Sequence, residues 1–96
     1  MRDEPGWIYT VHLHRPLGGA GRNGAQHYTG WTRDLAGRLA DHAAGRGSAM
    51  LAYCKQAGIG WHVGALRRGT PDDERRLKRQ HGAARWCWTC RAGGAR

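Results

Sequence analysis

The chain has 96 residues, of which 16 are Lys or Arg and 7 are Asp or Glu, and its formal net charge is +9. This length fits one domain, and no run approaches the roughly 20 apolar residues that span a bilayer. The first residues do not resemble a signal peptide, so we expect a cytoplasmic protein without a membrane partner. The charge favours a polyanionic partner, because each neutralised phosphate releases a counterion. A plainer origin is a GC-rich coding bias, since Arg, Ala and Gly dominate the sequence.

The first half of the chain predicts two strands followed by two helices. β-Forming residues predict strands over 7–14 and 25–31, and the glycines between them predict a loop. Apolar residues spaced by four predict a helix over 34–44. Ser48 is a typical N-cap for a second helix, and Gly58 suits the position just beyond its end.

The second half predicts one more strand and one more helix. Alternating apolar residues predict a strand over 59–67. Thr70, followed by a proline at 71, is a typical start for a helix that reaches about Gln80. The order β-β-α-α-β-α describes an α+β fold, a small three-stranded antiparallel sheet flanked by three helices. We divide the chain into a domain over 1–82 and a basic C-terminal tail over 83–96.

An ordered set of residues spans most of the chain. Two tyrosines lie on adjacent expected strands, within the motifs WIY and YTG, and two basic residues four apart share a face of the first helix. A glutamate follows in the first turn of the last helix. The set comprises Tyr9, Tyr28, Arg38, His42 and Glu74. Over residues 7–90 this arrangement resembles the GIY-YIG endonuclease family, especially its small standalone bacterial form.

The resemblance implies a metal-dependent endonuclease that hydrolyses DNA phosphodiester bonds. It implies that Tyr9 and Tyr28 are the paired active-site tyrosines, that Arg38 contacts the phosphate, and that His42 serves beside it. Glu74 is then the single metal ligand, for one Mg²⁺ or Mn²⁺ ion. Such hard ions are commonly held by one carboxylate together with water and phosphate oxygens. If the helix face points at the sheet, Arg38 and His42 can both reach Tyr28, and His42 would relay a proton.

The sequence departs from the family's pattern at several positions. Trp7 replaces the glycine of the first motif and Thr29 the isoleucine of the second, and Trp31 stands where some members carry lysine. Several members place an asparagine about three helical turns after the glutamate. In this chain that position falls near Trp86, and the only asparagine of the sequence is Asn23. A non-catalytic nucleic-acid binding module on the same fold is therefore the alternative.

DNA is the expected partner, and branched or damaged DNA is among the candidate substrates. The family spans repair, restriction, branched-DNA resolution and mobile elements, so the pathway and the oligomeric state stay open. Each candidate residue also has a plainer interpretation: the tyrosines as core aromatics, and Glu74 as an i,i+4 partner of Lys78. The candidate DNA contacts are basic residues of the expected helices and loops, namely Arg33, Arg46, Lys55, Lys78 and Arg79.

Three cysteines do not make a disulfide framework. Cys54 lies on an apolar stripe and is expected in the core. Cys87 and Cys90 have the spacing of a zinc-ligand pair, but a closed tetrahedral site needs four ligands. His81 is the nearest third candidate, and no fourth is evident, so the sequence argues against zinc. A small zinc-bound interaction protein remains the second alternative.

Overall fold

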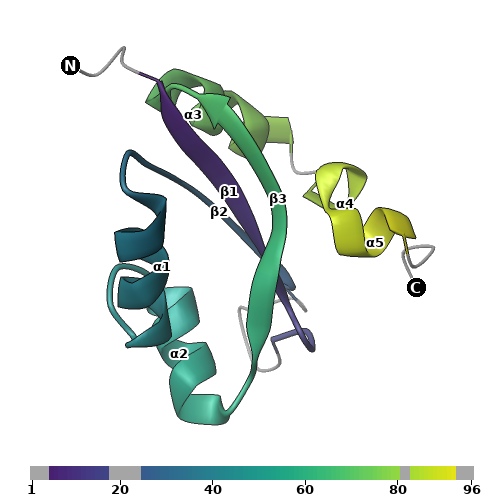
Figure 1. The fold of residues 1–96 in the computed structure, drawn as a ribbon. Coiled ribbons are helices and arrows are strands. Elements are labelled where there is room, and N and C mark those ends of the chain that lie inside the picture. The colour runs from purple at the N-terminus through teal and green to yellow at the C-terminus, as the bar shows by residue number, and fades with distance from the viewer. Residues whose placement is uncertain (1–4, 18–24, 81–82, 93–96) are drawn as a thin grey trace.

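The computed structural model describes residues 5–17, 25–80 and 83–92 (Figure 1). Within them, three strands form one antiparallel sheet of order β2-β1-β3. The strands are β1 (Gly6–Leu13), β2 (His27–Thr32) and β3 (Trp61–Gly69). The helices are α1 (Leu35–Ala43), α2 (Ala49–Ala57), α3 (Pro71–Gln80), α4 (Ala83–Trp86) and α5 (Trp88–Ala92). The predicted order β-β-α-α-β-α and the α+β class are confirmed, and the predicted boundaries agree to within two residues.

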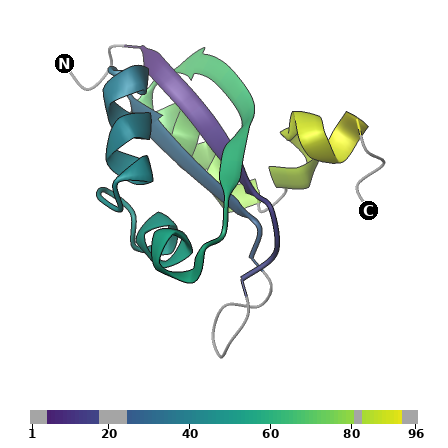
Figure 2. The ribbon, with the colours of Figure 1, turned by 60° about the horizontal axis from the view of Figure 1, so that its bottom comes forward.

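The sheet has helices on both sides, which we call the front face, covered by α1 and α2, and the back face, covered by α3, α4 and α5 (Figures 1 and 2). Successive side chains of β1 alternate between these faces. Tyr9, Val11 and Leu13 enter the front core together with Leu51 and Cys54. The prediction that Cys54 lies in the core is confirmed.

The two ends of α2 follow the capping chemistry that the sequence predicts, and α1 begins with a cap of the same kind at Asp34, the residue predicted as the first of that helix. The Asp34 side chain accepts from the backbone N–H of Gly37 at the start of α1, and Ser48 does the same for Leu51 in α2. Gly58 ends α2 with a φ of 74°, in the left-handed region that glycine adopts without strain. None of the helices in the described ranges is long and apolar enough to cross a membrane.

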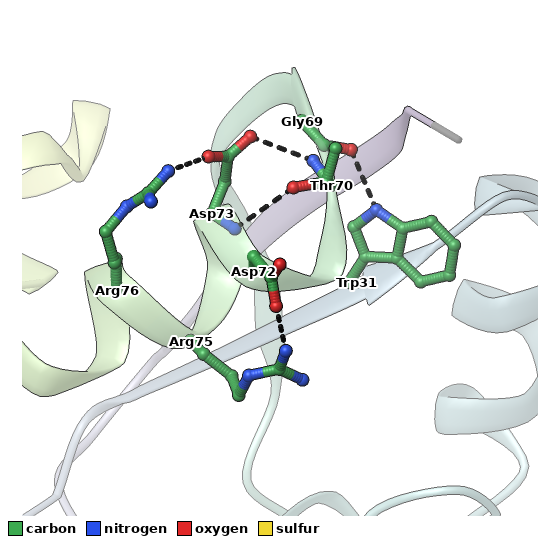
Figure 3. Close-up of polar contacts among 7 residues, drawn as sticks. All are labelled: Trp31, Gly69, Thr70, Asp72, Asp73, Arg75 and Arg76. Carbon is green, nitrogen blue, oxygen red and sulfur yellow. Dashed lines mark hydrogen bonds and ion pairs between the residues drawn. The ribbon is translucent and has the colours of Figure 1, made fainter. Parts of the chain in front are cut away.

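The start of α3 is fixed by reciprocal hydrogen bonds (Figure 3). The carboxylate of Asp73 accepts from the backbone N–H of Thr70 at 3.0 Å, and the Thr70 hydroxyl accepts from that of Asp73 at 3.2 Å. The indole of Trp31 in β2 donates to the carbonyl of Gly69 at 2.8 Å. These contacts tie the first turn of α3, which carries Glu74, to the end of β2.

The segment predicted as a tail contains α4 and α5, which pack on the back face. The Trp86 indole donates to the hydroxyl of Thr10 in β1 at 2.9 Å, and Cys87 is fully buried. Helices of four and five residues carry too little periodicity to be recognised in a sequence, because tertiary contacts rather than helix propensity stabilise them.

Candidate functional site

Tyr9 lies at the centre of the front face, on the central strand, and its side chain has no exposed surface. Its ring centroid is 6.2 Å from that of Tyr28 on β2 and 5.7 Å from that of His42 on α1. Gly30 stands opposite Tyr9 on β2, and a Cβ there would be 2.5 Å from the Tyr9 hydroxyl. A residue without a side chain is therefore needed beside this phenol.

His42 is the polar partner of Tyr9 and is itself completely buried. Its Nε2 is 2.7 Å from the Tyr9 hydroxyl, and its Nδ1 is 3.1 Å from the backbone carbonyl oxygen of Arg46. Because a carbonyl oxygen only accepts, Nδ1 carries the proton and donates to Arg46. Nε2 is left as the acceptor, so the Tyr9 hydroxyl donates to it.

The sequence led us to expect His42 beside Tyr28, and the structure gives it a different hydrogen-bond partner. His42 meets Tyr28 only edge to face, with ring centroids 5.5 Å apart, and hydrogen bonds to Tyr9. The reason is the strand order. Because β1 is the central strand, Tyr9 on its front face lies directly below α1 and contacts His42. Tyr28 lies on the edge strand and is half-buried, which leaves it the more accessible of the two tyrosines.

The protonation of Tyr9 is governed by its burial. Desolvation raises the pKa of Tyr9 above its usual value, and the neighbouring Tyr28 adds to this rise. The guanidinium of Arg38 lowers the pKa of the same phenol, so it lies close enough to act on it electrostatically. Tyr9 is therefore a neutral hydrogen-bond donor at ordinary pH, and Arg38 is the cation placed to stabilise negative charge there.

Glu74 reaches the tyrosine cluster through Lys78. Its carboxylate is 2.8 Å from the Lys78 ammonium, which lies 5.7 Å from the centre of the Tyr28 ring. Only 12% of the Glu74 side chain is exposed, against 50% for Lys78. The i,i+4 pairing that the sequence allowed as the plainer interpretation is thus present. The carboxylate nevertheless lies one ammonium away from Tyr28.

The other two carboxylates of the first turn of α3 point elsewhere. Asp72 and Asp73 form ion pairs with Arg75 and Arg76 (Figure 3). Glu74 is therefore the first-turn carboxylate that faces β2. Its oxygens suit Mg²⁺ or Mn²⁺, but among the described residues no group of three or more His, Cys, Asp or Glu surrounds it. An ion held there would need water and substrate phosphate oxygens to complete its shell.

The candidate DNA contacts do not form one cluster. All five are exposed and lie on α2, on α3 and in the loops that flank α1: Arg33, Arg46, Lys55, Lys78 and Arg79. Arg46 pairs with Asp41 at 3.0 Å. The structure adds a groove between β3 and α3 lined by arginines that the sequence analysis did not name, Arg67, Arg68 and Arg76.

A second cluster of chemically active side chains lies on the back face and includes two residues that sequence reasoning missed. The ligand atoms of His12, His27, Cys87 and Cys90 all lie within 4.8 Å of one another, so the group could hold a metal ion. The expectation against zinc depended on the lack of a third and fourth ligand, and His12 and His27 now supply both. His81, the earlier candidate, lies outside the described residues, as does Asn23.

A signal for these histidines was available in the sequence. His12 and His27 lie on the two strands of the predicted hairpin, and in the structure they are direct partners across β1 and β2. Burial lowers the pKa of both imidazoles, and it raises the pKa of the Cys90 thiol, which the neighbouring Cys87 raises further. Neutral imidazole nitrogens are the form that binds metals.

Comparisons of the chain with protein-family models, curated proteins and solved structures found no significant match. The chemistry of the two clusters therefore carries the functional inference.

Proposed function

We propose that the chain is a metal-dependent endonuclease of the GIY-YIG type, which hydrolyses DNA phosphodiester bonds. The observation that carries this proposal is the buried hydrogen-bond chain from the Tyr9 hydroxyl through His42 to the Arg46 carbonyl. A hydroxyl, an imidazole that accepts its proton, and a third group that orients the imidazole form the arrangement that activates oxygen nucleophiles in many enzymes.

The two tyrosines have different accessibility, and this suggests different roles. Tyr9 has no exposed surface, whereas Tyr28 is half-buried and contacts both Tyr9 and His42. Tyr28 is therefore the hydroxyl that meets the attacking water. Tyr28 would accept the proton of the water as it passes its own to Tyr9, and Tyr9 would pass its proton to Nε2 of His42, the imidazole nitrogen without a hydrogen. This places the proton acceptor in the core, away from solvent.

Charge on the scissile phosphate is balanced from two sides. Arg38 lies beside the phenols on α1, where its guanidinium can hold phosphate oxygens. Glu74 on α3 would hold the Mg²⁺ or Mn²⁺ ion, which supplies a Lewis acid to the phosphate. Lys78 must release Glu74 for this. The Lys78 side chain is half exposed, so a substrate phosphate can pair with its ammonium and release Glu74.

The test is cleavage of supercoiled plasmid, branched DNA, single-stranded DNA and RNA by the purified chain. Each substrate is incubated with Mg²⁺, with Mn²⁺ and without added divalent ion. We expect DNA cleavage that requires the added ion. Glu74→Gln should abolish it, whereas Asp72→Asn should not, because Asp72 is an exposed carboxylate of the same turn that pairs with Arg75. Equal activity of Glu74→Gln and the parent would refute the metal assignment.

A non-catalytic nucleic-acid binding module is the second candidate, and the Glu74–Lys78 ion pair favours it, because that pair occupies the only proposed ligand for Mg²⁺. Such a module would bind DNA with a steep salt dependence, losing orders of magnitude in affinity between about 50 and 200 mM salt if several phosphates are contacted. Binding of this kind, with no cleavage of any substrate, would select the module over the enzyme.

A further inference from the structure

We propose that His12, His27, Cys87 and Cys90 bind one structural zinc ion on the back face of the sheet. The site is separate from the tyrosine cluster, because Tyr9 and His12 lie three residues apart on β1 and point to opposite faces. It does not depend on the proposed nuclease activity.

Four of the six distances between the ligand atoms lie near the edges of a zinc tetrahedron, and all six are within 4.8 Å. His12 Nδ1 and His27 Nε2 are 3.2 Å apart, and Cys90 Sγ is 3.7 Å from the first and 3.4 Å from the second. Cys87 Sγ is 3.4 Å from His12 Nδ1. Zinc–nitrogen and zinc–sulfur bonds of about 2.05 and 2.3 Å give tetrahedral edges of roughly 3.3 Å between nitrogens and 3.6 Å between nitrogen and sulfur.

The ligands come from three parts of the chain that the fold brings together. His12 and His27 are cross-strand partners on β1 and β2. Cys87 lies between α4 and α5, and Cys90 lies within α5. Two ligands from a sheet and two from a short helical segment form a closed set of four, as in structural zinc sites of the Cys₂His₂ kind. No ligand position is left open for a substrate.

The sheet is shaped to admit Cys87. β3 carries an irregularity where Thr10 pairs with Ala65 and Val11 pairs with Val63, so Gly64 is the extra residue of a bulge. A Cβ on Gly64 would lie 2.7 Å from Cys87 Sγ and 3.3 Å from the Cβ of His12. The absence of a side chain at this bulge lets the thiol approach His12.

The ligand chemistry selects zinc over the ion proposed at Glu74. Two thiolates and two imidazoles are soft and borderline donors, which suit zinc, whereas Mg²⁺ takes oxygen ligands. A cysteine pair alone would also fit a disulfide. However, a disulfide gives no reason for two histidine nitrogens at 3.4 Å from the sulfurs.

The ion would fasten α4 and α5 to the sheet. These helices have four and five residues, too few to be stable without tertiary contacts. Trp86 to Thr10 at 2.9 Å and His62 to Thr89 at 2.6 Å are the other polar contacts that join this segment to the strands in the described part of the chain. Zinc binding thus contributes folding free energy to the C-terminal segment.

The first test is the zinc content of the full chain, purified without a metal-affinity tag from zinc-supplemented cells. We expect about one zinc per chain. Cys90→Ser should lower zinc affinity by more than about 100-fold in competition with a chelator. Loss of a group that only hydrogen bonds to a metal ligand already costs about 10- to 100-fold, and Cys90 is itself a ligand in the proposed site. Cys54→Ala is the matched control, because Cys54 is a buried cysteine of the front core, and it should keep its zinc.

A second measurement keeps the proposal testable if a variant does not fold. Cobalt(II) added to the metal-free parent chain should give the intense visible bands of a tetrahedral site and a thiolate-to-cobalt charge-transfer band. A parent chain with far less than one zinc, or cobalt spectra without thiolate bands, would overturn the proposal. So would full zinc affinity in folded Cys90→Ser. Absence of DNA cleavage would leave it intact, because none of these readouts uses activity.

Discussion

The two faces of the sheet carry different chemistry on the same strands. On the front face, phenol, imidazole and guanidinium groups meet around Tyr9, in a chain of hydrogen bonds that ends at a backbone carbonyl. On the back face, two imidazoles and two thiols converge, with their ligand atoms within 4.8 Å of one another. The difference follows from the side-chain alternation of β1, which sends Tyr9 and His12 to opposite sides.

The contrast separates two uses of histidine. His42 has a fixed tautomer, because Nδ1 donates to Arg46 and Nε2 accepts from Tyr9, which suits proton transfer. His12 and His27 present nitrogens to each other and to sulfur, which suits a metal. A chelator would remove an ion from either face, so it would not separate the proposal for the front face from that for the back face. Omission of Mg²⁺ is therefore a cleaner test of the front face than EDTA, which would also remove zinc.

The largest expected effect is on the front face. Arg38→Ala should lower the cleavage rate on the order of 10³-fold and DNA affinity only modestly, because the proposed mechanism assigns its guanidinium to charge that grows in the transition state. Zinc content should not change. Single-turnover rates and binding measured on the same DNA check this, with Arg15→Ala as the control, an exposed arginine that donates to the Ala57 carbonyl. Equal losses in rate and affinity would make Arg38 a simple binding residue.

Removing the Tyr9 hydroxyl should have the next largest effect. Tyr9→Phe keeps the ring but leaves buried Nε2 of His42 without a donor, at a cost of about 1–3 kcal/mol in unfolding free energy. If the pair moves a proton, cleavage should also slow on the order of 10²-fold. The control is Tyr53→Phe, a half-buried tyrosine of α2. A destabilised Tyr9→Phe that cleaves at the full rate would reduce the pair to a core hydrogen bond.

Two glycines allow each face to be disturbed without the other. Gly30→Ala would drive a methyl into the Tyr9 hydroxyl, and Gly64→Ala would drive one into Cys87 Sγ. Overpacking of this kind destabilises by about 1–3 kcal/mol in both cases. We expect Gly30→Ala to lose cleavage and keep zinc, and Gly64→Ala to lose zinc affinity and keep cleavage. Both assays are run on both variants, and each variant should fail only one of them. Loss of both functions in both variants would show that the faces are coupled.

The elements that position the front face could be predicted from the sequence. The capping residues Ser48 and Thr70 act where the sequence predicts them, since each hydrogen bond is local in the chain. The set of five candidate residues required long-range proximity, which the resemblance supplied. Even so, the sequence could not show that His42 would bond to Tyr9, because that depends on which strand is central.

The back-face site was harder to see for the same physical reason. His12 and Cys87 are 75 residues apart, and no local rule relates them. The cross-strand register of His12 and His27 was within reach of the predicted hairpin, but its loop length left the register undetermined. The short helices that carry the cysteines have no sequence period, so the sequence did not show that Cys87 and Cys90 pack against these two strands.

The smallest expected effect concerns the cap at the start of α3, whose residues Thr70 and Asp73 belong to neither cluster. Thr70→Ala removes the hydroxyl that accepts from the Asp73 N–H and should cost about 1 kcal/mol of unfolding free energy. Asp73 adds a dependence on pH. The backbone N–H of Thr70, followed by its hydroxyl and by Arg76, holds the pKa of the Asp73 carboxyl below its usual value. Because the folded pKa is lower than the unfolded one, this carboxylate stabilises the fold above the unfolded pKa and ceases to do so as the pH falls through the folded pKa.

Asp73→Asn should therefore be less stable than the parent near neutral pH, and the difference should shrink in acid. Asp72→Asn is the control, since the Asp72 carboxylate pairs with the Arg75 side chain, whereas that of Asp73 accepts from a backbone N–H (Figure 3). Urea unfolding of the three proteins from about pH 3 to 7 measures the effect. Neither variant should alter zinc content, because the back-face ligands lie on β1, β2 and the α4–α5 segment. A stability difference between Asp73→Asn and the parent that persists unchanged at acid pH would show that the carboxylate charge does not act at this cap.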